Sequence, residues 1–272
     1  MTGYQDWIGH RTEQSEPVTD RLVTHFRALL GDLTGPLPLP LGLHWCLMPD
    51  VAAQADLGRD GHPRLGLFLP DLGLPRRMWA GGEVRFDAPL TVGDTVTRAS
   101  TLTDIAFKSG GSGRLGFVTL THDWSVGGGI RIIERQDVVY REAPKADVVA
   151  VSAPAEAWLA DRSWTITPDP TLLFRYSALT FNGHRIHYDH PYATGTEGYA
   201  GLVVHGPLQA IWMMNFAADM LGRAPARFTY RGVSPLICGG AVVIEARTGG
   251  ADIALRVRNA DGAVTMQATA TP

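Results

Sequence analysis

GPLQAIWMMNFAADMLG, residues 206–222, is the stretch that decides the fold. Its apolar side chains predict a buried helix of about four turns. Four pieces with an extended pattern follow it, joined by tight turns: ARFTYRGVSPL, GAVVIEARTGG, ADIALRVRNADG and AVTMQATA. The C-terminal part of the chain is therefore expected to form one helix and then a meander of antiparallel strands.

The N-terminal part of the chain has the same order of elements. Residues 18–32, VTDRLVTHFRALLGD, predict a helix, and extended pieces separated by turn residues follow between residues 83 and 140. Both parts also carry Pro-Leu-x-x-Gly where one strand ends and the next begins, at Pro89 and at Pro235. A helix wrapped by a curved antiparallel sheet, present twice, is the tandem (double) hot-dog architecture, an α+β fold. We predict halves at 1–145 and 171–272, joined by a linker rich in Ala, Pro and Asp at 146–170.

Composition narrows the class of protein. The 272 residues are 45% hydrophobic and 19% charged, which is typical of a globular protein. A net charge of −3 gives no broad attraction for nucleic acid or for an acidic membrane, so neither is expected as a partner. Cys46 and Cys238 stand alone, and no signal peptide or apolar run of about 20 residues is visible. These features predict a cytoplasmic protein.

Two motifs suggest chemistry that their surroundings do not support. Residues 111–116 spell GxGxxG, but strands are predicted on both sides, where a nucleotide site needs a following helix. In FNGHRIHYDHPYATG, residues 181–195, three histidines are spaced three residues apart. On a helix, residues at i, i+3 and i+6 turn progressively away from one face, so three such histidines would not converge on one ion. A glycine and a proline also interrupt the segment, and we therefore expect no metal site.

The segment from residue 173 onward resembles the signature of the MaoC-like hydratases and dehydratases. In that family a D-x-N-P-x-H-x-D motif is followed, about fifteen residues later, by a helix that opens with His-Gly. The resemblance places the catalytic histidine at His187, the trailing aspartate at Asp189 and the pair at His205-Gly206. LPRRMWAGGEVRF (74–86) and RYSALTFNGHRIHYD (175–189) look typical of the branch whose N-terminal half is a degenerate, FAS1-type dehydratase hot dog. The C-terminal half would then be the catalytic one.

The motif departs from the family at one position that matters for chemistry. Asn182 stands where the family has its catalytic Asp, and an amide cannot act as a base. We therefore expect His187 to perform both proton transfers of a hydration, with Asn182 aiming the water through its amide oxygen. His184 is expected to bind the same water or to orient His187, and Asp189 is the weaker alternative base. The N–H of Gly206 is expected to stabilise the enolate at the positive end of the helix.

The resemblance also suggests a substrate. The branch includes hydratases that convert mesaconyl-C4-CoA or itaconyl-CoA to citramalyl-CoA, and (3R)-hydroxyacyl-thioester dehydratases, which run the same chemistry backwards. Arg76 and Arg77 suggest a carboxylate clamp, although surface positions or contacts to CoA phosphates explain them equally well. Trp79 and His205 are further candidate substrate-binding residues. A hot-dog thioesterase and a non-catalytic acyl-CoA binder stay open as alternatives. No cofactor is expected beyond the CoA of the substrate, and the chain can be a monomer or a homodimer.

Overall fold

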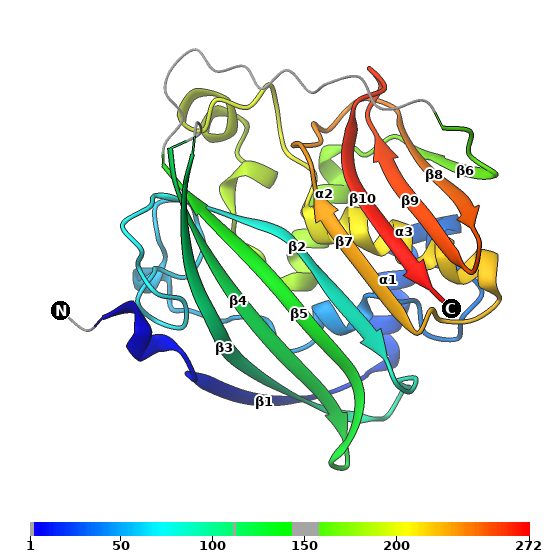
Figure 1. The fold of residues 1–272 in the computed structure, drawn as a ribbon, viewed down its shortest axis with the longest axis horizontal. Helices are drawn as coiled ribbons and strands as arrows, with labels where there is room; N and C mark the ends of the chain where they lie inside the picture. The colour runs from blue at the N-terminus through cyan, green and yellow to red at the C-terminus, as the bar shows by residue number, and fades with distance from the viewer. Residues whose placement is uncertain (1–2, 111–112, 143–157) are drawn as a thin grey trace.

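The computed structural model describes residues 3–110, 113–142 and 158–272 (Figure 1). Within these residues the strands form one ten-stranded antiparallel sheet in the order β1-β3-β4-β5-β2-β7-β10-β9-β8-β6. Their bounds are β1 Arg11–Pro17, β2 Arg76–Phe86, β3 Thr95–Gly110, β4 Gly113–Val126, β5 Gly129–Arg141, β6 Arg162–Ile166, β7 Arg227–Gly232, β8 Val242–Gly249, β9 Asp252–Arg258 and β10 Val264–Thr271.

The strand order is symmetrical about the middle of the sheet. In each half the first strand, β1 or β6, forms the outer edge, and the second strand, β2 or β7, lies at the centre. β2 and β7 pair antiparallel, with Gly82 opposite Tyr230, and so join the two halves into one sheet. This arrangement is the double hot dog that the repeated order of elements predicts.

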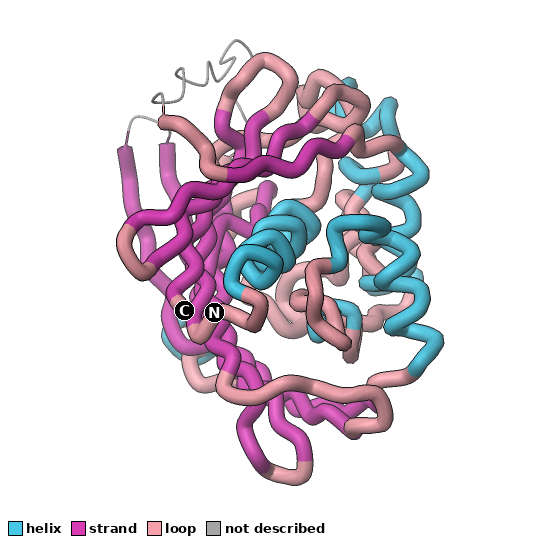
Figure 2. Tube along the Cα trace, turned by 90° about the vertical axis from the view of Figure 1, so that its right-hand side faces the viewer, coloured by secondary structure: helices cyan, strands magenta, loops and turns pink. Residues whose placement is uncertain are grey.

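The helices cover one face of this sheet (Figure 2). They are α1 Asp20–Leu30, α2 Pro170–Thr180 and α3 Gly206–Leu221. All residues from 208 to 218 of α3 are buried, since the helix is apolar all round and packs against β8, β9 and β10. Gly222 ends it in a left-handed conformation. Residues 206–222, which predicted a buried helix, thus form the core helix of the C-terminal half.

The N-terminal half has no long counterpart of α3 among its described residues. α1 packs on α2, and each of these helices follows the edge strand of its half. Between α1 and β2 the chain forms short 3-10 turns only: η2 Gly31–Thr34, η3 Leu43–Cys46 and η4 Gln54–Asp56. The prolines of GPLPLPLG, residues 35–42, cannot continue a helix, because each lacks an N–H donor. The wrapped helix that we expected in both halves is therefore present in the C-terminal half only.

Three further features predicted from the sequence are the linker, the GxGxxG hairpin and the lack of a membrane-spanning segment. β6 lies inside the stretch predicted as a linker, and residues 143–157 fall outside the described part, so the domain boundaries stay a prediction. The GxGxxG stretch joins β3 to β4, which pair as far as Gly110 opposite Gly113, so it belongs to a hairpin; residues 111–112 are not described. No helix in the described ranges is long and apolar enough to cross a membrane.

Candidate active site

The turn after α2 begins the site. Phe181 caps α2 in a left-handed conformation (φ 50°, ψ 32°), and the N–H of Asn182 donates to the carbonyl of Ser177 at 2.8 Å. The side-chain oxygen of Asn182 then accepts a hydrogen bond from the backbone N–H of His184 at 2.9 Å. Asn182 thus orders this turn, as Asn does in many tight turns. Its predicted contact with the attacking water stays a prediction.

His187 lies at the end of the 3-10 turn η5 Arg185–His187 and is buried, with 6% of its surface exposed. Its Nδ1 is 2.7 Å from the backbone oxygen of Val203. A carbonyl only accepts, so Nδ1 carries the proton and Nε2 keeps a free lone pair. Burial lowers the pKa of His187 to about 3, so the ring is neutral at physiological pH. His187 can therefore act as a base through Nε2.

His205 supports the ring of His187 from behind. The two imidazoles stack with their centroids 3.5 Å apart, and Nε2 of His205 is 2.9 Å from the hydroxyl of Ser177. His205 is fully buried and directly precedes α3, so the stack holds His187 at the start of that helix. The sequence suggested that His205 binds substrate; the structure instead gives it a position from which it orients His187.

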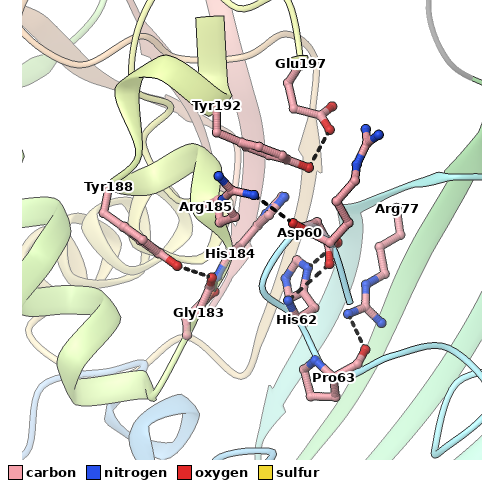
Figure 3. Close-up of polar contacts among 12 residues, drawn as sticks. Asp60, His62, Pro63, Arg77, Gly183, His184, Arg185, Tyr188, Tyr192 and Glu197 are labelled. Carbon is pink, nitrogen blue, oxygen red and sulfur yellow. Dashed lines mark hydrogen bonds and ion pairs between the residues drawn. The ribbon is translucent and has the colours of Figure 1, made fainter. Parts of the chain in front are cut away.

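His184 connects this pair to the N-terminal half. Its ring lies edge-on to that of His187, with centroids 5.3 Å apart, and 4.1 Å from the ring of His62 (Figure 3). Nδ1 of His62 is in turn 2.8 Å from a carboxylate oxygen of Asp60. The backbone oxygen of Asp60 accepts from the N–H of Arg185 at 2.8 Å, which fixes the loop against the turn. We call His62, His184, His187 and His205 the histidine cluster.

Sequence reasoning missed Asp60 and His62. Their stretch, LGRDGHPRLG at residues 57–66, is rich in glycine and proline, predicts only a loop, and lies more than 100 residues before the histidine motif. The signal that could have found them is an aspartate and a histidine two residues apart in a loop, a spacing that allows the carboxylate to hold an imidazole. Nothing in the sequence shows that this loop packs on the turn at Gly183.

The electrostatics of the cluster follow from burial and from its charged neighbours. Burial, and then the nearby His62, lower the pKa of His184 to about 2. Although burial opposes it, the hydrogen bond from His62 together with the charge of Arg77 holds the pKa of Asp60 well below its usual range. The cluster therefore consists of neutral imidazoles beside one ionised carboxylate.

The side chains of Arg76 and Arg77 have different partners, because successive residues of a strand point to opposite sides of the sheet. Arg76 forms a half-buried ion pair with Glu197 at 2.5 Å and also donates to its backbone oxygen. Arg77 donates to the carbonyl of Pro63 at 3.0 Å (Figure 3), and from there its positive charge lowers the pKa of Asp60 and of His184. Its guanidinium is thus at the cluster, whereas that of Arg76 is neutralised.

A small cavity lies between these groups. Its volume is about 20 Å³, and its lining includes Asp60, Arg77, His184, Ile186 and Tyr199. A polar cavity of this volume is large enough for one water molecule. The cavity adjoins both the C-terminal turn and the N-terminal loop, so both halves of the chain contribute to it.

Trp79 and Gly206 are in contact. A Cβ atom at Gly206 would lie 2.9 Å from Cε3 of Trp79, whose ring stacks on Tyr230 with centroids 4.4 Å apart. Trp79 is therefore the nearest group to the open side of Gly206. The N–H of Gly206 belongs to the first turn of α3, where amides have no partner within the helix. It can therefore donate to a developing negative charge.

Asp189 does not face the cluster. One of its oxygens pairs with Arg185 at 2.7 Å, and the other accepts from the N–H of Tyr192 at 3.0 Å, at the start of the π-helical turn η6 Tyr192–Thr196. These contacts give Asp189 a role in ordering the segment and leave no oxygen aimed at His187. The structure therefore does not support Asp189 as the alternative base or as a substrate ligand.

The evenly spaced histidines do not converge on a metal. His190 is exposed, and His184 and His187 meet edge to face. Within the described ranges, donor atoms that could share a metal ion belong to Asp60, His62 and His184, all within 4.8 Å of one another. Arg77 places a positive charge beside them, which disfavours a cation.

Comparisons with known proteins identify the family of this chain. Residues 42–238 match the family described as hydroxyacyl-thioester dehydratase type 2. The chain is 42% identical over 272 residues to the mesaconyl-C(4)-CoA hydratase of Chloroflexus aurantiacus, covering 97% of this chain and 95% of that protein.

Solved structures share the fold. HtdX of Mycobacterium tuberculosis superposes with a TM-score of 0.70 at 17% identity, over 96% of this chain and 99% of that one. A second protein of that organism, described as a double hot dog, gives a TM-score of 0.58 at 13% identity, over 98% and 97% of the two chains. The family match and the 42% identity over nearly the whole length show that this chain belongs to the hydroxyacyl-thioester dehydratase type 2 family and is a hydro-lyase, and the solved structures show that it has the double hot-dog fold.

Proposed function

We propose that the protein adds water to the C=C bond of a short, methyl-branched dicarboxylyl-CoA thioester, with mesaconyl-C4-CoA as the first choice and itaconyl-CoA as the second, to give citramalyl-CoA. The observation that carries this proposal is the neutral ring of His187, whose Nδ1 is tied to Val203 beside the first turn of α3. The named relative at 42% identity acts on the first of these substrates according to its name.

The residues of this chain can supply each part of the reaction. Nε2 of His187 takes a proton from water while the water oxygen bonds to the β-carbon. The electrons of the C=C bond move toward the thioester carbonyl, whose oxygen accepts a hydrogen bond from the N–H of Gly206. In mesaconyl-C4-CoA, whose C=C bond is conjugated to the thioester, His187 then returns the proton to the α-carbon, so that one water is added and the enzyme is unchanged. In itaconyl-CoA the C=C bond is not conjugated to the thioester, and the proton goes to the terminal CH2 carbon instead. Dehydration is the reverse of these steps.

Arg77 supports the choice of a dicarboxylyl substrate. It lies at the small cavity with Asp60 and His184, where it can bind the distal carboxylate by a charge-assisted hydrogen bond. Arg76 was predicted to share this role, but its partner is Glu197. The predicted pair is therefore revised to a single clamp, Arg77.

A substrate panel tests this proposal: mesaconyl-C4-CoA and crotonyl-CoA are assayed for loss of the enoyl absorbance, and itaconyl-CoA, which lacks a conjugated enoyl thioester, is assayed for formation of citramalyl-CoA. We expect turnover of the dicarboxylyl esters above that of crotonyl-CoA. Arg77→Met should lower kcat/KM for the dicarboxylyl esters by about 30-fold or more, a loss of about 2 kcal/mol, and change crotonyl-CoA turnover much less. Arg85→Met, which removes an exposed arginine on the same strand, is the control. Equal activity on plain and dicarboxylyl chains contradicts the substrate assignment.

The second candidate is a (3R)-hydroxyacyl-thioester dehydratase, which the family description favours. It uses the same residues in the opposite direction, and faster turnover of a plain 3-hydroxyacyl thioester than of citramalyl-CoA identifies it. A thioesterase is disfavoured, because the first turn of α3 carries no acidic residue that could activate water there.

The proposal also covers the oligomeric state, the cofactor requirement and the cellular compartment. Both halves of the site come from one chain, so a monomer is sufficient for activity, and a homodimer stays compatible with it. CoA enters as part of the substrate, and no further cofactor is required by the steps above. We propose the cytoplasm as the compartment in which this substrate is met.

A further inference from the structure

The C-terminal motif lacks a carboxylate at the position where the resemblance expects one. Asn182 stands there, and its oxygen binds the N–H of His184. Asp189 pairs with Arg185 instead. Among the described residues, the carboxylate hydrogen-bonded to the histidine cluster is that of Asp60, which comes from the N-terminal half.

The loop that carries Asp60 is docked by its backbone. The N–H of Arg185 donates to the backbone oxygen of Asp60. A Cβ at Gly61 would lie only 2.0 Å from the backbone oxygen of Gly183, so the two glycines allow the two segments to approach closely. The N–H of Gly58 also donates to the carbonyl of His62 at 2.7 Å. Within the loop, one oxygen of Asp60 accepts from the N–H of His62 at 3.1 Å, a bond that the side-chain oxygen of an asparagine could keep.

The tautomer of His62 follows from its contact with Asp60. The carboxylate accepts from Nδ1, so Nε2 of His62 carries a lone pair. A ring nitrogen of His62, one of His184 and an oxygen of Asp60 all lie within 4.8 Å of one another. That separation suits a single water that hydrogen-bonds to both imidazoles, and the adjoining cavity has the volume for it.

We propose that Asp60 and His62 form a carboxylate–imidazole dyad that completes the reaction centre from the N-terminal half. In this arrangement His62 and His184 hold the attacking water, which makes His62 a catalytic residue. Asp60 is a positioning residue: it fixes the tautomer of His62 and supplies the negative charge that the amide at Asn182 cannot. The inference rests on the proposed hydration and adds that its machinery is divided between both halves.

A metal at the same residues is the competing explanation. The direct bond between Asp60 and His62 occupies a ring nitrogen that a metal could use, and Arg77 lies alongside. The water-binding arrangement needs neither a third ligand nor removal of this arginine. We therefore favour the dyad, and metal dependence becomes one outcome of the test.

The test compares Asp60→Asn, His62→Gln and the double variant in hydration of mesaconyl-C4-CoA. Asp56→Asn is the matched control for the first, because Asp56 lies in the same loop and pairs with Arg64 at 2.9 Å. His190→Gln is the control for the second, because His190 is exposed. For each variant, kcat, KM, the Kd of citramalyl-CoA and the midpoint of urea unfolding are measured, and the assays are repeated with EDTA.

We expect kcat to fall about 100-fold or more in His62→Gln and about 10-fold or more in Asp60→Asn. KM, the Kd of citramalyl-CoA and the unfolding midpoint should stay near those of the unaltered chain. The double variant should be no slower than His62→Gln alone, because residues that act as a unit are not additive. Both controls should keep full activity.

Other results overturn the inference. A kcat within threefold of the unaltered chain in His62→Gln, or a loss of kcat matched by lost binding or folding, shows that the dyad has no catalytic part. Inactivation by EDTA with recovery on Zn²⁺ assigns the residues to a metal. Activity that needs His187 but survives both dyad changes refutes this inference alone, whereas an unaltered chain that hydrates no thioester of the panel refutes the proposed function and this inference with it.

Discussion

Replacing Gly206 by alanine tests the contact between the first turn of α3 and Trp79. The added Cβ would lie 2.9 Å from Cε3 and 3.4 Å from Cζ3 of the indole. The ring cannot yield easily, because it stacks on Tyr230 at 4.4 Å and meets Trp45 edge-on at 5.6 Å. Overpacking of this kind costs about 1–3 kcal/mol, and the better helix propensity of alanine returns at most about 1 kcal/mol. We therefore expect Gly206→Ala to lower the free energy of unfolding by about 1–2 kcal/mol.

The assay is urea unfolding, read as a double-mutant cycle with Trp79→Leu, which removes the ring that the methyl group would strike. The cost of Gly206→Ala should largely disappear in the Trp79→Leu background, giving a coupling energy of about 1–2 kcal/mol. Gly195→Ala, where no atom lies within 4 Å of the added Cβ, should change stability by less than about 0.5 kcal/mol. An equal cost of Gly206→Ala in both backgrounds refutes the contact.

Three further predictions concern titration and packing. Because burial lowers the pKa of His187 to about 3, kcat/KM for hydration should show no inflection near pH 6.5; a fall with that midpoint contradicts the neutral ring. Burial likewise lowers the pKa of His44 to about 3, so the unfolded chain takes up protons first as pH falls from about 6.5. The free energy of unfolding should then fall by up to about 1.4 kcal/mol per pH unit for each such histidine, and a shallower slope in His44→Gln, measured by urea unfolding at several pH values, checks it. Asn215, fully buried in α3, binds both the N–H and the carbonyl of Leu41 at 3.0 and 2.9 Å, so Asn215→Leu should cost about 2–4 kcal/mol in urea unfolding. Met214→Leu is the control, at less than about 1.5 kcal/mol, and equal costs contradict the role of the amide.

The sequence was sufficient for the parts of the fold whose signals are local. The apolar run of α3, the capped helix α1 and the long strands between residues 83 and 140 have periodicity that a few neighbouring residues reveal. The edge strands β1 and β6 were missed, because β1 is polar and largely exposed, and β6 is only five residues long, too short for its two alternating apolar residues to stand out. The loss of the central helix in the N-terminal half is visible only once the prolines of residues 35–42 are compared with α3.

The site was predicted in part for the same reason. The motif around His187 is continuous in sequence, so its position at the start of α3 could be anticipated, and the stack with His205 confirms that proximity. Partners that come from distant segments could not: Glu197 takes Arg76, and Asp60 reaches the cluster through a loop that precedes it by more than 100 residues. Such pairings depend on how the two halves meet, which no local pattern encodes.

The turnover number of His187→Gln on mesaconyl-C4-CoA tests the central claim most directly. The glutamine amide can still donate to the carbonyl of Val203, so the fold and the binding of citramalyl-CoA should persist, but it cannot take a proton from water. We expect kcat to fall about 10²–10⁴-fold relative to the unaltered chain, with His190→Gln fully active. A folded His187→Gln variant that hydrates the substrate within threefold of the normal rate contradicts the account.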